Sequence, residues 1–186
     1  MTIHPWQTLS RKELLQHPRL HIVEDEVRLP DGKTTQYVRQ APAKVHTVGI
    51  IAINDNHELL LQREYSYPPN KVMWQLPGGG MLEGESVIEA AKRELSEECD
   101  LTANACEIIG SFYYDNRRSD GKQYIVVCTD LSPLRGQKDA EEFLENHWVP
   151  FAKLPAMIQA NEFENVNLLA ALNIWFCKNR LAPDSK

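Results

Sequence analysis

Residues 79–101 have the sequence GGMLEGESVIEAAKRELSEECDL and contain both the clearest helix signal and the densest acidic group of the chain. Ser86 is a residue type that caps helices, and Glu89 follows three positions later, as in a capping box. Apolar residues then recur at helical spacing. A helix is therefore predicted from Ser86 to Cys99.

Three glutamates gather on one stripe of this helix. With about 100° of rotation per residue, Glu98 lies about 40° to one side of Glu94, and Glu97 about 60° to the other. Crowded like charges disfavour ionisation unless a cation is present, and clustered carboxylate oxygens suit Mg²⁺ or Mn²⁺. A solvated acidic face is the simpler interpretation of an isolated Glu-Glu pair, so the surrounding pattern decides between the two.

That pattern resembles the Nudix box: Gly, five residues, Glu, seven residues, then Arg-Glu-aliphatic-x-Glu-Glu-x-Gly-aliphatic. Eight of the nine specified positions match between Gly79 and Leu101, and the probability of a chance match is on the order of 10⁻⁶. The departure is Asp100, where the family has Gly. Because Asp tolerates left-handed backbone geometry, we expect an altered helix cap and little change in chemistry.

The resemblance implies a metal-dependent Nudix pyrophosphohydrolase. Its metal ligands would be the carbonyl of Gly78 with Glu94 and Glu98, and Glu97 would be either a further ligand or the holder of a metal-bound water. A diphosphate bridge repels an attacking hydroxide through its own negative charge, and metal ions neutralise that charge. Mg²⁺ is therefore the expected cofactor, with Mn²⁺ as a substitute.

The resemblance also implies an orienting ion pair between Arg93 and Glu85, which would hold the glycine loop against the helix. The alternative is a surface ion pair that contributes little. With this pair, Glu97 and Glu98 complete the catalytic residues expected within the box.

An acidic stretch at 139–145 adds a further candidate outside the box. In the branch of the family described next, a loop glutamate at about this place acts as a base or as an extra metal ligand. Glu142 is the first choice and Glu141 the second. The alternative is an exposed acidic loop.

Residues 59–68, LLLQREYSYP, and 74–79, WQLPGG, resemble the ADP-ribose and nucleoside-diphosphate-sugar pyrophosphatase branch. This branch implies hydrolysis of ADP-ribose to AMP and ribose 5-phosphate, with GDP-mannose or another nucleotide sugar as the alternative substrate. Two departures concern the substrate. Ser66 stands where the branch usually has arginine, and the loop 114–120 lacks the Pro-Gly of the branch.

Four residues are expected to contact the substrate. Arg63 lies in the segment that carries the resemblance to the branch. Arg117 or Arg118 would supply a cation in place of the missing arginine, because guanidinium suits phosphate; equally, both are solvated loop charges. Trp6 would stack on the base or, as the alternative, anchor the N-terminal arm.

The fold class predicted is α+β, and the resemblance implies the α/β/α Nudix sandwich with a mixed sheet and an N-terminal β-hairpin extension. Residues 1–44 would form the extension and residues 45–186 the Nudix domain. The strands and helices expected in the latter are 45–53 paired with 58–63, 74–77, 107–111, 124–129 and 147–149, with helices at 86–99, 152–159 and 165–178.

The extension is expected to contain a short helix at 8–16, capped by Ser10, and a hairpin of strands 21–29 and 34–39. A two-stranded hairpin is barely stable alone, so it needs another surface. In this branch that surface is commonly a second subunit, which implies a homodimer formed through the extension. The alternative is a hairpin folded back on its own domain.

Bulk properties exclude several classes. The chain has 186 residues, 42% of them hydrophobic, and a net charge of −6, which argues against a nucleic-acid binder. No apolar run approaches the ~20 residues of a membrane span, and no signal peptide is visible. The four cysteines lack a C-x-x-C spacing, as expected of free thiols in the cytoplasm.

Two rival functions remain open. A non-catalytic ADP-ribose sensor would usually lose box carboxylates or carry a DNA-binding domain, whereas every box carboxylate is present here. A nucleoside-triphosphate pyrophosphatase would usually lack the N-terminal hairpin.

Overall fold

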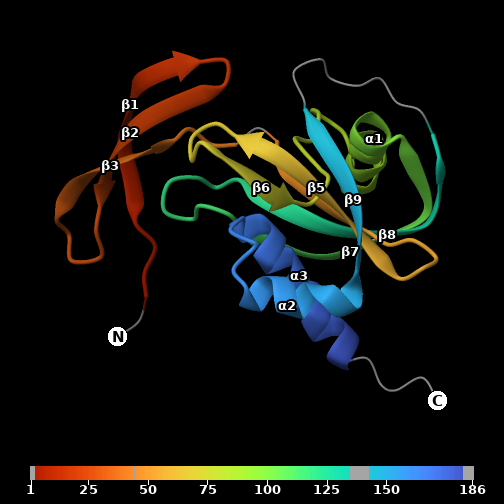
Figure 1. The fold of residues 1–186 in the computed structure, drawn as a ribbon. Helices are drawn as coiled ribbons and strands as arrows, with labels where there is room; N and C mark the ends of the chain where they lie inside the picture. The colour runs from red at the N-terminus through yellow and green to blue at the C-terminus, as the bar shows by residue number, and fades with distance from the viewer. Residues whose placement is uncertain (1–2, 44, 135–142, 182–186) are drawn as a thin grey trace. The chain divides into compact units, whose positions relative to one another are not determined.

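The computed structural model describes residues 3–43, 45–134 and 143–181 (Figure 1). The chain divides into two compact units. The smaller unit comprises Met1–Lys44 and Tyr113–Gly121, and the larger unit comprises Val45–Phe112 and Lys122–Lys186.

The smaller unit is built on an antiparallel sheet of β1 (Gln7–His17), β2 (Leu20–Arg28) and β3 (Thr34–Gln40), in the order β1-β2-β3. The predicted hairpin is confirmed as β2 and β3. The short helix predicted at 8–16 is wrong, because those residues form β1 and pair with β2 from end to end.

The reason for this error is visible in the side chains of β1. Ser10 and Glu13 have the spacing of a capping box, but both contact β2 instead: Ser10 hydrogen-bonds Glu26 at 3.2 Å, and Glu13 pairs with His21. A short turn after His17 lets the two strands pair directly. Tertiary pairing therefore overrides the local helix signal.

Asp25 links all three strands of this sheet. Its carboxylate, 3% exposed, accepts a hydrogen bond from Arg11 Nε on β1 at 2.6 Å and one from Arg39 Nε on β3 at 2.8 Å. The hydrogen bond from Arg11, supported by that from Arg39, holds the pKa of Asp25 below its usual value against the opposing effect of burial. The carboxylate therefore stabilises the sheet only while it is ionised.

Asp25→Asn should destabilise the smaller unit by about 2 kcal/mol, since it leaves two guanidinium groups without their carboxylate while solvent partly screens Arg11. The folded pKa lies below the unfolded value of about 3.9, so the wild-type advantage is complete above that value. It is lost as the pH falls through the folded pKa. Denaturant titrations at neutral and acidic pH measure the difference. The exposed variant Asp55→Asn is the control, and equal losses in both variants would contradict the prediction.

The larger unit contains two three-stranded sheets. One sheet has the order β4-β8-β7, with β4 parallel to β8, and the other is antiparallel in the order β6-β5-β9. Their strands are β4 (Thr47–Ala52), β5 (Glu58–Ser66), β6 (Lys71–Gln75), β7 (Leu101–Tyr113), β8 (Lys122–Pro133) and β9 (Leu144–Pro150).

The pairing predicted between 45–53 and 58–63 is wrong except at one isolated bridge, which joins Ile53 to Leu59. β4 pairs with β8 instead, and β5 lies between β6 and β9. Most of β4 is fully buried, as is typical of a parallel strand that is covered on both faces.

Helices cover both sides of these sheets (Figure 1). Helix α1 packs through Ala91 and Leu95 against Ile50 and Val126 in one apolar cluster. The C-terminal helices pack against the opposite face of the sheets, in a second apolar cluster that includes Ile51 of β4 and Leu168 of the last helix. The α/β/α sandwich is thus confirmed. The helices are α1 (Val87–Cys99), the 3-10 turn η1 (Phe151–Lys153), α2 (Leu154–Gln159) and α3 (Val166–Leu181).

The three helices predicted in the larger unit agree with the structure within a few residues, whereas β7 and β8 extend several residues beyond the predicted strands. No helix in the described residues is long and apolar enough to cross a membrane.

Candidate active site

Gly78, Gly79 and Gly80 form a glycine loop that follows β6 in the chain. In space this loop contacts both β4 and α1. The backbone N–H of Val48 donates to the carbonyl of Gly79 at 2.9 Å, which fixes the loop to β4. Gly78 has φ +139°, and a Cβ at this position would lie 2.2 Å from the carbonyl oxygen of Val48. A Cβ on Gly79 would lie 2.7 Å from Glu94 Oε1. Both glycines are therefore needed for the loop to approach the strand and the helix this closely.

Helix α1 spans Val87–Cys99, in agreement with the predicted helix, whereas the altered cap expected at Asp100 is not seen. Ser86 and Glu89 form both hydrogen bonds of a capping box. Asp100 terminates the helix in the left-handed conformation, with φ 55°. The replacement of the family's Gly by Asp is therefore accommodated by the backbone, and the helix cap is retained.

Glu98 is buried behind the glycine loop. Its Oε2 accepts the backbone N–H of Gly78 at 2.9 Å and Nε2 of Gln62 at 3.1 Å. The side chain of Asn146 donates to the backbone carbonyl of Glu98 at 2.9 Å. Gln62 on β5 and Asn146 on β9 stand opposite each other in the sheet, so two neighbouring strands position this carboxylate.

These two supporting amides were missed by the sequence analysis. Gln62 follows three consecutive leucines and is fully buried. A polar residue that continues a buried apolar run was the available signal, because a buried amide requires a partner. Asn146 has no comparable signal in the sequence.

Arg93 connects the loop with the helix. It forms a two-point ion pair with Glu85, in which Nε and Nη2 lie 2.9 and 3.1 Å from the carboxylate oxygens. Nη2 also donates to the carbonyl of Gly80 at 2.8 Å. Nη1 donates to Glu94 at 2.8 Å and to Glu97 at 2.9 Å. One guanidinium thus joins three carboxylates and the loop backbone.

The hydrogen bonds between Arg93 and the carboxylates stabilise the charged forms of Arg93 and Glu85. The hydrogen bond from Arg93, followed by the backbone N–H of Leu82, holds the pKa of Glu85 below its usual value. The pKa of Arg93 is raised, first by its hydrogen bond with Glu85 and then by Glu94 and Glu97. The ion pair is therefore intact at neutral pH.

The donor set fits a hard cation such as Mg²⁺. Glu94 and Glu98 are buried, and Glu97 is half-buried on the same side of α1. Carboxylate and carbonyl oxygens are the ligands that Mg²⁺ prefers, and Gly79 allows the backbone to approach Glu94. Within the described ranges, no three His, Cys, Asp or Glu side chains are arranged to hold a metal. Glu94 and Glu97 are directed at Arg93 instead.

The structure thus brings together six predicted site residues, namely Gly78, Glu85, Arg93, Glu94, Glu97 and Glu98. Arg63 is the predicted substrate contact that belongs to the larger unit. Arg63 on β5 lies over the ring of Trp74, 5.5 Å from its centroid.

The remaining predicted substrate contacts belong to the smaller unit, and the two predicted candidates for the base are not described by the structure. Trp6 packs edge-on against Tyr37, with ring centroids 6.0 Å apart. The carbonyls of Arg117 and Arg118 accept hydrogen bonds from the Tyr37 hydroxyl and the Gln40 N–H, and both side chains are exposed. Glu141 and Glu142 lie outside the described residues.

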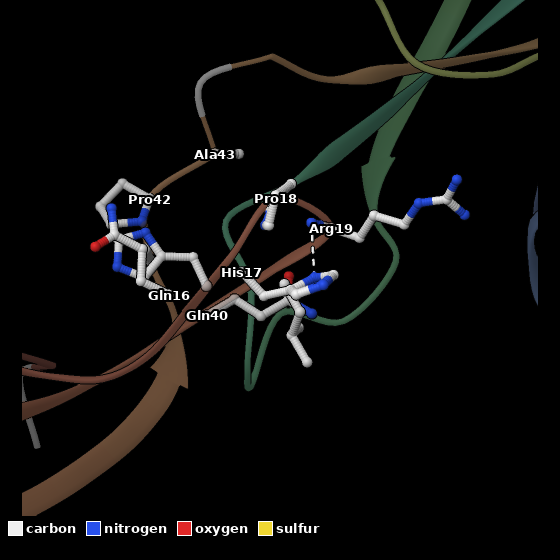
Figure 2. A pocket seen from close by; sticks show the side chains of 10 residues that line it. Gln16, His17, Pro18, Arg19, Gln40, Pro42 and Ala43 are labelled. Carbon is white, nitrogen blue, oxygen red and sulfur yellow. Dashed lines mark hydrogen bonds between the residues drawn. The ribbon is translucent and has the colours of Figure 1, made fainter.

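The smaller unit has a hollow of about 620 Å³ at the turn between β1 and β2 (Figure 2). His17 and Arg19 lie in its wall, and the backbone N–H of Arg19 donates to His17 Nδ1 at 3.2 Å. Gln40 and Pro42 contribute from the end of β3 and beyond. None of its lining residues belongs to the Nudix box, so its size does not make it the catalytic site.

Two families of known proteins match separate stretches of the chain. The NUDIX domain family matches residues 43–172. The nucleoside diphosphate sugar hydrolase N-terminal domain matches residues 6–37.

Relatives match over nearly the whole length. ADP compounds hydrolase NudE of Escherichia coli (strain K12) is 31% identical over 172 residues, which cover 90% of this chain and 92% of that protein. ADP-ribose pyrophosphatase of Bacillus subtilis (strain 168) is 22% identical over 177 residues, which cover 94% and 95%. The crystal structure of an ADP compounds hydrolase has the same fold, with a TM-score of 0.89 at 24% identity, covering 98% of this chain and 100% of that one. The chain therefore belongs to the NUDIX domain family and is a Nudix pyrophosphohydrolase.

Proposed function

We propose that this enzyme hydrolyses the diphosphate linkage of a nucleoside diphosphate sugar with Mg²⁺, and that ADP-ribose, cleaved to AMP and ribose 5-phosphate, is its preferred substrate. The observation that carries the proposal is the complete set of box carboxylates, joined to the glycine loop through Arg93 and the Gly78 N–H. Relatives that are named for ADP-ribose or ADP compounds support the substrate class. GDP-mannose or another nucleotide sugar is the alternative.

The carbonyl of Gly78 with Glu94 and Glu98 would hold the metal, and Glu97 would either bind it or hold a metal-bound water. When bound, Mg²⁺ or Mn²⁺ supplies neutralisation of the diphosphate charge and activation of the attacking water. Glu94 and Glu97 share Arg93 Nη1, so the single positive charge of the guanidinium offsets only part of the negative charge around it and leaves net negative charge that a cation would balance.

Residues of the chain would prepare the site in other ways. Gly78 and Gln62 fix one oxygen of Glu98, so this carboxylate needs little reorganisation during the reaction. Arg93 and Glu85 keep the loop at the start of the helix. Glu142, or Glu141 in its place, would serve as the base or a late metal ligand. Both precede β9 in sequence, and β9 carries Asn146, which contacts Glu98.

The proposed substrate contacts are Arg63, one of Arg117 and Arg118, and Trp6. The match of residues 6–37 to the nucleoside diphosphate sugar hydrolase N-terminal domain supports a nucleotide sugar over a nucleoside triphosphate. The intact box supports an enzyme over a non-catalytic ADP-ribose sensor. All four cysteines are free thiols, which supports action in a reducing compartment, and we place the enzyme in the cytoplasm.

A panel of nucleotide sugars and nucleoside triphosphates, assayed with Mg²⁺ and a coupled phosphatase, tests this proposal. ADP-ribose should give the highest kcat/KM, chelator should abolish turnover, and Mg²⁺ or Mn²⁺ should restore it. Full activity in excess chelator would contradict the metal chemistry. Faster cleavage of triphosphates would contradict the substrate class. Tight binding of ADP-ribose without turnover would favour the sensor.

A homodimer formed through the extension is part of the same proposal. β1 is exposed along its entire length, including Leu14 and Leu15 at 44% and 47%, and it is an edge strand of its sheet, whose unpaired backbone groups can pair with a second chain. Light scattering of the protein used in the substrate panel measures its mass. A monomer at micromolar concentration would contradict the dimer, and a dimer that persists after deletion of residues 1–40 would place the interface elsewhere.

A further inference from the structure

A small polar pocket of about 100 Å³ lies within the larger unit, beside the glycine loop. Gly78 forms part of its wall, so the pocket adjoins the backbone proposed to approach the metal and the diphosphate. Four side-chain amides line it: Gln75 from β6, Gln123 from β8, and Asn165 and Asn167 at the start of α3. Its remaining lining residues are aliphatic. We call it the amide pocket.

Two of the four amides already have partners. Gln75 donates to Glu64 at 2.6 Å. Asn165 accepts the backbone N–H groups of Asn167 and Leu168 at 2.9 and 3.3 Å, and thereby caps α3. These contacts are structural, and they hold the rim of the pocket in place.

The other two amides each have an oxygen without a partner. The side-chain oxygens of Gln123 and Asn167 are buried, and neither accepts a hydrogen bond within the part of the chain that the structure describes. Gln123 is only 7% exposed. A buried polar atom without a partner costs about 1–3 kcal/mol, and native proteins contain few of them. Two such oxygens in one small pocket leave it able to hydrogen-bond a bound molecule that carries donor groups.

The absence of a side chain at Gly49 on β4 leaves room for the amide of Gln123. A Cβ at Gly49 would lie 2.4 Å from Gln123 Nε2, so any other residue at position 49 would displace the side chain. The amide nitrogen therefore packs against the backbone of Gly49, while the amide oxygen accepts no hydrogen bond from the described residues.

The chemistry of the lining selects the kind of ligand. None of the residues that line the pocket carries a charge or an aromatic ring, so it suits neither a phosphate, which needs cations, nor a base, which prefers a stacking surface. Uncharged amides match hydroxyl groups, which both donate and accept hydrogen bonds. A nucleoside is also too large for about 100 Å³, whereas part of a sugar ring is not.

We infer that the amide pocket is a specificity subsite for hydroxyl groups of the sugar half of the substrate, with Gln123 and Asn167 as the contacting residues. This inference rests on the proposed function, because Gly78 places the pocket next to the diphosphate only if the glycine loop binds it. A group linked directly to the second phosphate would then reach the two amides.

The test compares two substrates that share the diphosphate but differ in the sugar. One is the nucleotide sugar that the wild-type enzyme prefers, and the other is the methyl ester of the matching nucleoside diphosphate. Gln123→Met and Asn167→Leu should each lower kcat/KM for the nucleotide sugar by about tenfold, the effect of losing one hydrogen bond. Turnover of the methyl ester should stay within about threefold. Gln159→Met, at an exposed position on α2, is the matched control and should change neither.

The binding affinity, measured by isothermal titration calorimetry in the absence of metal, gives a second readout. Wild-type protein should bind the nucleotide sugar more tightly than the nucleoside diphosphate alone, and both variants should lose that difference while their melting temperatures stay unchanged or rise. Equal loss of activity on both substrates would overturn the subsite, as would unchanged activity on both, which would leave the pocket as a site for water. A wild-type enzyme that hydrolyses the methyl ester but no nucleotide sugar would refute the proposed function instead.

Discussion

Glu98→Gln is expected to lower kcat by about 10²–10³-fold, the effect of removing a main electrostatic stabiliser from an active site. The substitution keeps the size of the side chain and an oxygen that can accept the hydrogen bonds now made by Gly78 and Gln62. It removes the negative charge that makes the residue a ligand for a hard cation. The fold should therefore survive while the chemistry fails.

Glu97→Gln is expected to lower kcat by at least about 10²-fold for the same reason. Glu97 is half-buried and contacts Arg93 Nη1, and an amide oxygen can still accept that hydrogen bond. Neutralising one of several crowded carboxylates also relieves their mutual repulsion, so the melting temperature should fall little in either variant.

Steady-state kinetics with saturating Mg²⁺ and thermal melts of the same samples measure both effects. Glu107→Gln on β7 is the matched control, because it changes an exposed glutamate of the same unit. Turnover close to that of the wild type in both α1 variants would show that the box carboxylates do not carry the reaction.

The contrast between two Ser-x-x-Glu sequences shows what the chain alone can predict. Ser86 and Glu89 form the predicted capping box of α1, whereas Ser10 and Glu13 have the same spacing and belong to a strand. The two segments differ in their tertiary partners, since β2 supplies contacts for both Ser10 and Glu13. Local signals therefore predict an element correctly only where no distant segment competes for the same side chains.

The same limit applies to the site. The box residues are predictable because they lie within one loop and one helix, where spacing fixes which side chains meet. The amides that support Glu98 come from β5 and β9, and Gln123 comes from β8. Their proximity depends on which strands pair, and the pairing predicted between β4 and β5 is wrong because β4 pairs with β8. An error in sheet topology thus conceals contacts that no motif encodes.

Arg93→Met is expected to destabilise the larger unit by about 2–3 kcal/mol, less than the cost of breaking a fully buried ion pair because Arg93 and Glu85 are partly exposed to solvent. The variant leaves Glu85 without its two-point partner and removes the one guanidinium contact that Glu94 and Glu97 share. The carbonyl of Gly80 also loses its donor. Activity should fall together with stability, because the loop is no longer held at the start of the helix.

Arg93→Lys should recover only part of this loss. An ammonium group carries the charge but cannot reproduce the planar fork that meets both oxygens of Glu85. Lys153→Met, which removes an exposed cation from η1, is the control for a simple change of charge.

The double variant Arg93→Met with Glu85→Leu separates the ion pair from the rest of the network. Because it removes both partners, it should be more stable than the sum of the single losses implies, and the difference is the coupling between the two residues. The pH dependence provides an independent check. The folded pKa of Glu85 lies below its unfolded value of about 4.3, so the ion pair stabilises fully above that value and loses its contribution as the pH falls through the folded pKa. The gap in unfolding free energy between wild type and Arg93→Met, measured by denaturant titration, should therefore narrow in acid. A gap that stays constant from neutral pH to pH values well below 4 would show that Arg93 stabilises the loop by packing rather than by its charge.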